Sequence, residues 1–102
     1  MANYLFAYYG GTMAPTPAAR KKSMDAWNAW FAKMGKSVVD MGAPTKPGKM
    51  VSKSGAKAIS SDPVTGWSVV KADSLDAAVN LAKTSPQLSA GGQIGVYEVL
   101  PM

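Results

Sequence analysis

The sequence contains neither cysteine nor histidine among its 102 residues. Because cysteine is absent, the chain can form no disulfide, no thiolate nucleophile and no thiolate metal site. Because histidine is absent, it lacks the side chain that most often serves as a general base near neutral pH or as a metal ligand, and every imidazole-based triad is excluded. Any catalysis must therefore use Asp, Glu, Lys, Arg, Tyr or Ser, and no metal or cofactor is expected.

Long apolar runs are absent as well. No stretch is long enough to cross a bilayer, and the segment 1–9 lacks the basic start of a signal peptide. Together with the lack of cysteine, these features predict a cytoplasmic protein that makes no contact with membranes. Residues 1–102 are expected to form a single domain, because this length is typical of one domain with its own core.

Acidic residues are scarce, and the formal net charge is +5. The basic residues gather in two places: Arg20, Lys21 and Lys22, and then Lys46, Lys49, Lys53 and Lys57. Surfaces for single-stranded nucleic acids place exposed aromatic residues beside basic ones, whereas here the aromatic strands and the basic segments are separate. We therefore do not expect a nucleic-acid partner, and we interpret the central lysines as protection of an exposed strand edge.

Hydrophobic periodicity and turn residues divide the chain into alternating strands and helices. The predicted strands span residues 4–9, 36–41, 66–72 and 93–100, the predicted helices span 17–34 and 73–84, residues 42–48 form a loop, and residues 50–60 form a hairpin that turns at Ser54 and Gly55. Gly35 is expected to end the first helix, and Ser85 with Pro86 the second. This order predicts an α+β fold in which two helices cover one face of a mostly antiparallel sheet.

Each predicted helix has one apolar face. The spacing i, i+3, i+4, i+7 is occupied by apolar residues twice, at Trp27, Trp30, Phe31 and Met34 and again at Leu75, Ala78, Val79 and Ala82. Asp73 and Asp76 resemble a capping box at the start of the second helix. The methionines, with Met24 and Met34 on the first helix, are interpreted as gap-filling core residues.

The strands around residues 4–9, 67–72 and 94–100 are apolar on both faces, whereas the two helices can cover only one. No predicted element remains to cover the second face. A second copy placed sheet to sheet would cover it, and two-fold dimers are the commonest such assemblies. The sequence therefore predicts a homodimer.

Several segments resemble the YCII-related family. They are the run 66–83, Ser85-Pro86-Gln87-Leu88, the segment 94–102, and Ser61-Asp62-Pro63 in place of the family's Asp-Gly-Pro-Phe element. The resemblance covers nearly the whole chain and implies a ferredoxin-like sandwich that dimerises through its sheets into an α/β barrel, with a cleft at the edge of each sheet.

The chain departs from this family at the residues that carry imidazole chemistry. Close relatives have Cys-Pro-His-Leu where this chain has residues 85–88, and the first-helix histidine of some relatives falls near Met24. A catalytic role through imidazole is therefore excluded.

Six residues are candidates for a ligand site: Tyr4, Tyr8, Arg20, Asp62, Trp67 and Gln87. The aromatic ones can stack on a planar ligand or fill the core and the dimer interface. Arg20 opposes the helix dipole, which an anionic ligand would explain, but a solvated cluster is also tolerable. Asp62 is the candidate general base or a turn residue that bonds its own backbone. Gln87 can bond a ligand carbonyl or cap the second helix.

Three functions remain open. The first is binding of a small anionic or aromatic metabolite in the cleft without imidazole chemistry. The second is a lyase or isomerase acting on a lactone or small acid, in which Asp62 is the base and Tyr8 or Arg20 stabilises an enolate. The third is a protein–protein interaction or regulatory module that uses the sheet face or the lysine-rich hairpin.

Overall fold

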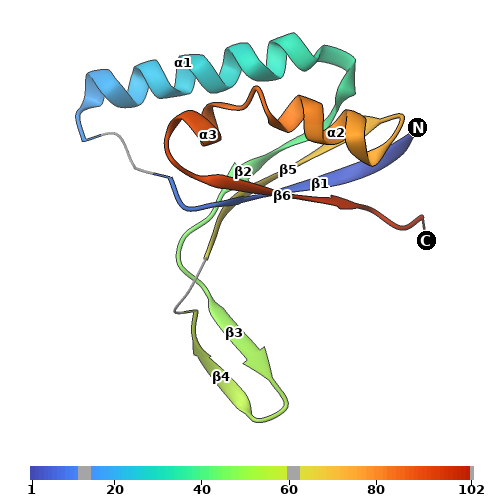
Figure 1. The fold of residues 1–102 in the computed structure, drawn as a ribbon. Coiled ribbons are helices and arrows are strands. Elements are labelled where there is room, and N and C mark those ends of the chain that lie inside the picture. The colour runs from blue at the N-terminus through green and yellow to red at the C-terminus, as the bar shows by residue number, and fades with distance from the viewer. Residues whose placement is uncertain (12–14, 60–62, 102) are drawn as a thin grey trace.

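The computed structural model describes residues 1–11, 15–59 and 63–101. The elements are, in chain order, β1 (Ala2–Tyr9), α1 (Pro17–Met34), a 3-10 turn η1 (Gly35–Ser37), β2 (Val38–Pro44), β3 (Lys49–Ser52), β4 (Gly55–Ala58), β5 (Val64–Ala72), α2 (Leu75–Ala82), α3 (Pro86–Ser89) and β6 (Gln93–Glu98). The three helices lie on one side of the main sheet (Figure 1). This arrangement confirms the predicted α+β fold.

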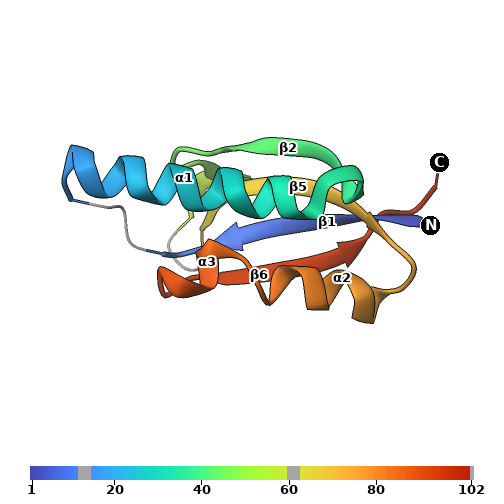
Figure 2. The same ribbon diagram turned by 90° about the horizontal axis from the view of Figure 1, so that it is seen from above.

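The main sheet has four strands in the order β2-β5-β1-β6, and each neighbouring pair is antiparallel. Helix α1 connects β1 to β2, and helices α2 and α3 connect β5 to β6, so two split β-α-β units interlock (Figure 2). This is the strand order of a ferredoxin-like sandwich. Strands β2 and β6 are the edges of the sheet, and β1 and β5 are its centre.

Helix α1 begins and ends where the sequence predicts. The hydroxyl of Thr16 accepts a hydrogen bond of 3.1 Å from the backbone N–H of Ala19, and Gly35 ends the helix at a φ of 53°. Trp30 and Met34 are buried, and Trp27 and Phe31 pack beside them, so the predicted apolar face is confirmed.

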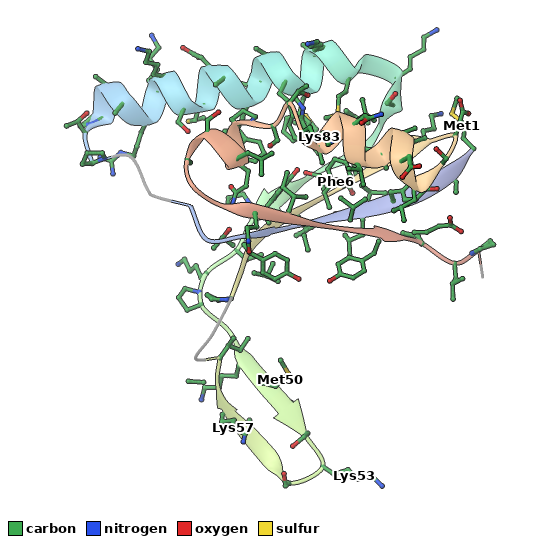
Figure 3. The ribbon with its side chains drawn as sticks, viewed as in Figure 1. Met1, Phe6, Met50, Lys53, Lys57 and Lys83 are labelled. Atoms are coloured by element: carbon green, nitrogen blue, oxygen red, sulfur yellow. The ribbon has the colours of Figure 1, made fainter. Side chains whose placement is uncertain are left out.

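The core lies between the helices and the inner face of β1 and β5. Strand alternation places Tyr4, Phe6 and Tyr8 on this face, where Phe6 is fully buried and stacks on Trp30 with ring centroids 6.2 Å apart. Figure 3 shows Phe6 between the sheet and the helix layer. Burying such a side chain contributes about 1.5–3 kcal/mol to stability.

The methionine prediction is largely wrong. Met34 is buried in the core, but Met24 is 65% exposed on α1, and the other exposed methionines include Met1, Met41 and Met50. Met24 precedes the part of α1 that packs on the sheet, so the helix periodicity continues into a segment that has no core beneath it.

Several predicted boundaries also differ from the structure. Strand β2 spans Val38–Pro44, because a turn of 3-10 helix occupies its predicted start and the strand continues past Gly42 into the predicted loop. The N-cap of α2 is Ser74, whose hydroxyl accepts from the N–H of Ala77, so the capping box of two aspartates is wrong. The chain after α2 forms a third helix, α3, because Ser85 caps a new turn that starts at Pro86.

Strands β3 and β4 form a separate two-stranded sheet that turns through Lys53 and Ser54. This hairpin projects from the main sheet on the side opposite the helices (Figure 1). The predicted hairpin is confirmed, with its turn one residue earlier than predicted because Gly55 belongs to β4, but it extends away from the main sheet as an arm.

Candidate functional site

An apolar groove runs along the edge of the sheet between β6 and the helices. It has a volume of about 350 Å³ and is lined by Leu75, Val79, Ala82, Lys83, Leu88, Ile94 and Val96, a set that we call the β6 groove. All of its lining residues are apolar except Lys83, which follows the last turn of α2. The groove can therefore take an apolar ligand body and place one negative group near an ammonium.

The β6 groove follows from the shortness of α2 and from the break after it. Helix α2 has 8 residues, and the hydroxyl of Ser85 then accepts from the N–H of Gln87 at 3.1 Å and starts α3. This break places Leu88 beside the inner-face residues Ile94 and Val96 of the edge strand. A continuous helix would not offer the same concave wall.

A second groove of about 410 Å³ lies between α1 and α3, lined by Ala26, Ala29, Trp30, Lys33, Thr84, Pro86 and Ser89. Its central polar groups already bond one another. The Trp30 Nε1–H donates to the Thr84 hydroxyl at 3.1 Å, and that hydroxyl donates to the Leu81 carbonyl at 2.9 Å. The second groove also contains one lysine, Lys33, and serves as the comparison for the β6 groove.

A buried chain of hydroxyls runs from β1 to β2 beneath the helices. The Tyr8 hydroxyl donates to the Ser68 Oγ at 2.7 Å, and the Ser68 hydroxyl donates to the Met41 carbonyl at 2.7 Å. The Trp27 ring contacts Tyr8 edge-on with centroids 5.1 Å apart. Burial raises the pKa of Tyr8 from 10.0 to about 12, although the hydrogen bond with Ser68 opposes the rise.

The stability of the protein at alkaline pH should depend on this chain of hydroxyls. Between pH 10 and about 12 the unfolded chain ionises Tyr8 while the folded protein keeps its proton, so the free energy of unfolding should fall over this window. Two pKa units correspond to about 2–3 kcal/mol. Tyr8→Phe should lower the free energy of unfolding by about 1 kcal/mol at neutral pH, because it removes the hydrogen bond to Ser68. Between neutral pH and pH 12, the variant should lose about 2–3 kcal/mol less stability than the wild-type protein does. Urea unfolding at both pH values measures this difference.

Comparison of the wild-type protein with Tyr8→Phe at neutral pH and at pH 12 isolates the contribution of Tyr8, because the other tyrosines are the same in both proteins. Equal alkaline losses in the wild-type protein and in Tyr8→Phe would contradict the expectation.

Tyr4 belongs to the core. Its ring is buried, and its hydroxyl donates to the Glu98 carboxylate at 3.2 Å across the neighbouring strand pair. Burial, together with the hydrogen bond and charge of Glu98, raises the pKa of Tyr4. These contacts give Tyr4 a role in joining β1 to β6.

Trp67 lies on the opposite face of the sheet from Tyr4 and Tyr8. Its register partner on β1 is Ala7, which alternates with the inward-facing tyrosines. The register places Trp67 on the helix-free side, which we call the open face, together with Leu5, Ala7, Tyr9, Val69 and Tyr97. The aromatic residues singled out in the sequence are thus divided between two faces.

The open face has a small-residue row across its centre. Ala7 pairs with Trp67 on one side and with Gly95 on the other. A β-carbon at Gly95 would lie 2.9 Å from the Tyr97 ring and 3.1 Å from the Tyr9 ring, so both rings fold over this glycine. The result is an apolar, aromatic surface that the helices do not cover.

Gln87 and Arg20 occupy separate positions. The buried Gln87 amide donates from Nε2 to the carbonyls of Tyr9, at 2.9 Å, and Gly10, at 3.2 Å, and thereby fixes the end of β1 to α3. Arg20 is exposed in the first turns of α1. Asp62 lies outside the described residues. The five candidate residues that the structure describes therefore lie in separate places.

The β6 groove itself was missed in the sequence analysis, although Leu75, Val79 and Ala82 had been noted as part of an apolar helix face. The available signal was the combination of a short helix with a following strand that carries Ile94 and Val96 on one face. Within the described parts of the chain, no group of three or more acidic side chains is placed to hold a metal ion. No helix among these residues is long and apolar enough to cross a membrane.

Comparison with known proteins supports the fold. No family model matches the chain, and no curated protein matches it. A solved structure of 5-chloro-2-hydroxyhydroquinone dehydrochlorinase from Burkholderia phenoliruptrix, in complex with 2,5-dihydroxybenzoquinone, is similar with a TM-score of 0.57. The likeness covers 96% of this chain and 95% of that chain at 17% sequence identity, so it shows a shared fold.

Proposed function

We propose that the protein binds a small organic anion with an apolar or aromatic body in the β6 groove, and that it does so as a cytoplasmic homodimer of the YCII-related type. The observation that carries the proposal is a groove of about 350 Å³ that is lined by apolar side chains and by one charged residue, the exposed Lys83. Ligand pockets are typically apolar clefts of about 300–1,000 Å³ with few polar groups.

The expected affinity follows from the contacts that a ligand would make in the β6 groove. Burying about 100–150 Å² of apolar ligand surface against Val79, Ile94 and Val96 contributes roughly 3 kcal/mol. An exposed ammonium such as that of Lys83 adds about 0.2–1 kcal/mol to the binding of a carboxylate. A total near 4 kcal/mol corresponds to a dissociation constant of about 1 mM, which suits a metabolite present at high concentration.

The similar solved structure supports the ligand class. That dehydrochlorinase holds a small planar oxygenated ring, 2,5-dihydroxybenzoquinone, on the same fold. Because fold does not determine function, the activity of that enzyme is not carried over. The cysteine-free sequence is the basis for placing the protein in the cytoplasm.

The alternative of a lyase or isomerase receives less support from the described residues. The Tyr8 hydroxyl donates to Ser68 within the core, and Arg20 is exposed on α1. A group that stabilises an enolate must face the reacting carbonyl. We therefore favour ligand binding as the function.

The binding test is a titration with aryl carboxylates and hydroxyquinones, followed by the amide chemical shifts of the protein. The shifts should concentrate on residues of the β6 groove. Val79→Glu should abolish them, because it places a carboxylate among the apolar contacts, and Lys83→Met should weaken binding of the carboxylates about two- to fivefold. Shifts confined to other parts of the chain would refute the site.

Lys33→Met is the matched control, because Lys33 lines the second groove in the same way that Lys83 lines the β6 groove. It should leave the titration unchanged. Equal weakening by both lysine substitutions would mean that the ligand responds to net charge and not to the β6 groove.

Dimerisation through the open face is the second part of the proposal. The open face presents Leu5, Trp67 and Val69 without a covering helix, and contiguous apolar surfaces of this kind mark interfaces. A second copy with its own open face provides a matching partner, since a two-fold interface uses the same patch on both subunits.

A further inference from the structure

The β3–β4 hairpin is an ordered element that is exposed along its entire length. Every residue of its two four-residue strands is exposed. Met50 is 58% exposed and Val51 is 73% exposed. Figure 3 shows Met50 and Lys57 along the hairpin and Lys53 at its tip, far from the core. An isolated two-stranded hairpin is only marginally stable in water, so this one needs a surface to pack on.

The two faces of the hairpin differ. Val51 and Lys49 share one face with their partners Ala56 and Ala58, whereas Met50 pairs with Lys57 on the other face. Each face therefore combines apolar side chains with one strand lysine, and the Val51 face is the more apolar of the two. Either face can place its apolar groups on another protein while the lysine ammonium stays in water.

The direction of the hairpin points to a second copy as that protein. The hairpin leaves the sheet on the side of the open face, so it forms a wall beside that face (Figure 1). Viewed from above the helices, it lies behind the sheet, which agrees with this direction (Figure 2). Any copy that stacks on the open face would come to lie beside the hairpin.

The area of the sheet is a second reason to expect that the hairpin takes part in the dimer interface. Four strands spaced at about 4.8 Å, with about six residues each rising 3.3 Å, present roughly 400 Å² of flat area. A stable interface buries about 800 Å² on each partner. The sheet alone supplies on the order of half of this area, and the hairpin extends the same surface.

Repulsion between like charges determines which orientation of the two copies is favoured. Residues 41–59 contain four lysines and no carboxylate. If both hairpins lay at the same end of the dimer, these two basic sets would meet. If the two-fold axis runs across the strands, each hairpin instead reaches the other end of its partner's sheet, where β1 begins at Ala2 and β5 ends at Ala72. We call this the terminal end.

The terminal end suits a basic partner better than the hairpin end does. Its charges balance, with the carboxylates Asp73, Asp76 and Glu98 against the cations Lys36, Lys71 and the Met1 amine, whereas the hairpin end carries only cations between residues 41 and 59. It also exposes apolar groups, with Met1, Val99 and Leu100 among the exposed hydrophobic residues. Avoidance of contacts between like charges fixes the register of an interface more than it adds affinity.

We propose that the β3–β4 hairpin is an arm exchanged between the two copies, which packs along the terminal end of the partner's sheet. This inference rests on the proposed dimer. The arm contributes to dimer affinity and sets the direction in which the two sheets cross.

The first test compares two exposed methionine sites. The double substitution Met50→Ser and Val51→Ser should raise the dimer dissociation constant at least tenfold in sedimentation experiments, while the unfolding of the dissociated monomer stays as it was. Met24→Ser, at an equally exposed methionine on α1, should leave the dissociation constant unchanged. An unchanged dimer dissociation constant in the hairpin variant would overturn the proposal that the hairpin is an exchanged arm.

The second test locates the arm directly. Because the chain has no cysteine, Lys53→Cys carries a single nitroxide at the hairpin tip. Mixed with isotope-labelled wild-type protein, it should broaden the amide signals of the partner at Asn3, Lys71 and Ala72. Broadening at Tyr9 and Val64, or none in a confirmed dimer, would overturn the proposal. A wild-type protein that sediments as a monomer would refute the dimer as well, and neither result depends on the β6 groove.

Discussion

Replacement of Gly42 by alanine is expected to destabilise the domain strongly. Gly42 has a φ of 72°, and an added β-carbon would lie 1.7 Å from the Trp67 carbonyl oxygen and 2.6 Å from its carbon. Both atoms belong to the backbone of the central strand β5, so no side-chain rotation can relieve the overlap. Strand β2 would have to leave β5.

The expected loss is at least about 4 kcal/mol, from the left-handed backbone strain and the lost strand pairing together. Since domains of this kind are stable by only about 5–15 kcal/mol, the variant should be largely unfolded or should unfold at much lower urea concentration. Circular dichroism during urea unfolding measures the loss.

Gly35→Ala separates the effect of backbone strain from the effect of the overlap with a neighbouring strand. Gly35 has a φ of 53°, but nothing lies within 4 Å of its added β-carbon, so this variant keeps the backbone strain without the overlap. It should lose about 1–2 kcal/mol. Equal losses at both glycines would mean that the close approach of β2 to β5 does not occur.

The same glycine explains one limit of the sequence-based prediction. The stretch around Gly42 and Pro44 contains turn residues and was predicted to be a loop, yet it continues β2. The register along β5 shifts between Val38 and Asp40 and again between Asp40 and Ala43, and the Asp40 carboxylate accepts from the Gly42 N–H at 2.8 Å. Bulged strands are set by their neighbours, and a single segment carries too little information to reveal them.

Features that depend on local periodicity were predictable. The apolar face of α1 around Trp30 and Met34, and the inward alternation of Tyr4, Phe6 and Tyr8, needed only spacing. The detached hairpin and the third helix depended on where the chain finds a core, which spacing cannot show. The division of Tyr8 and Trp67 between two faces depended on the register that pairs Ala7 with Trp67.

The candidate site shows the same contrast. The sequence pointed to residues with distinctive chemistry, such as Gln87, which the structure uses to fasten Tyr9 and Gly10 to α3. The β6 groove is made of ordinary apolar residues from two helices and an edge strand. Its only distinctive member, Lys83, looks like any exposed lysine until the groove beside it is known.

A single charge on the open face should separate the proposed dimer. Leu5 lies at the centre of that face between Val69 on β5 and Tyr97 on β6. In Leu5→Lys, both copies would bring an ammonium into the interface, and an uncompensated buried charge costs about 3–5 kcal/mol. Because each of the two copies carries the substitution, the dimer dissociation constant should rise at least about a thousandfold. Light scattering at micromolar concentration should then give the mass of one chain.

The fold of the monomer should survive this change, because Leu5 faces away from the core formed by Phe6 and Trp30. Met24→Lys adds the same charge at an exposed position of α1 and should leave the dimer mass intact. If Leu5→Lys kept the dimer mass while the wild-type protein was a dimer, the interface would have to lie elsewhere, with the exposed face of α1 or the β6 edge as the remaining surfaces. If Leu5→Lys gave monomers that still bound the aryl carboxylate, ligand binding in the β6 groove would be a property of each chain and independent of assembly.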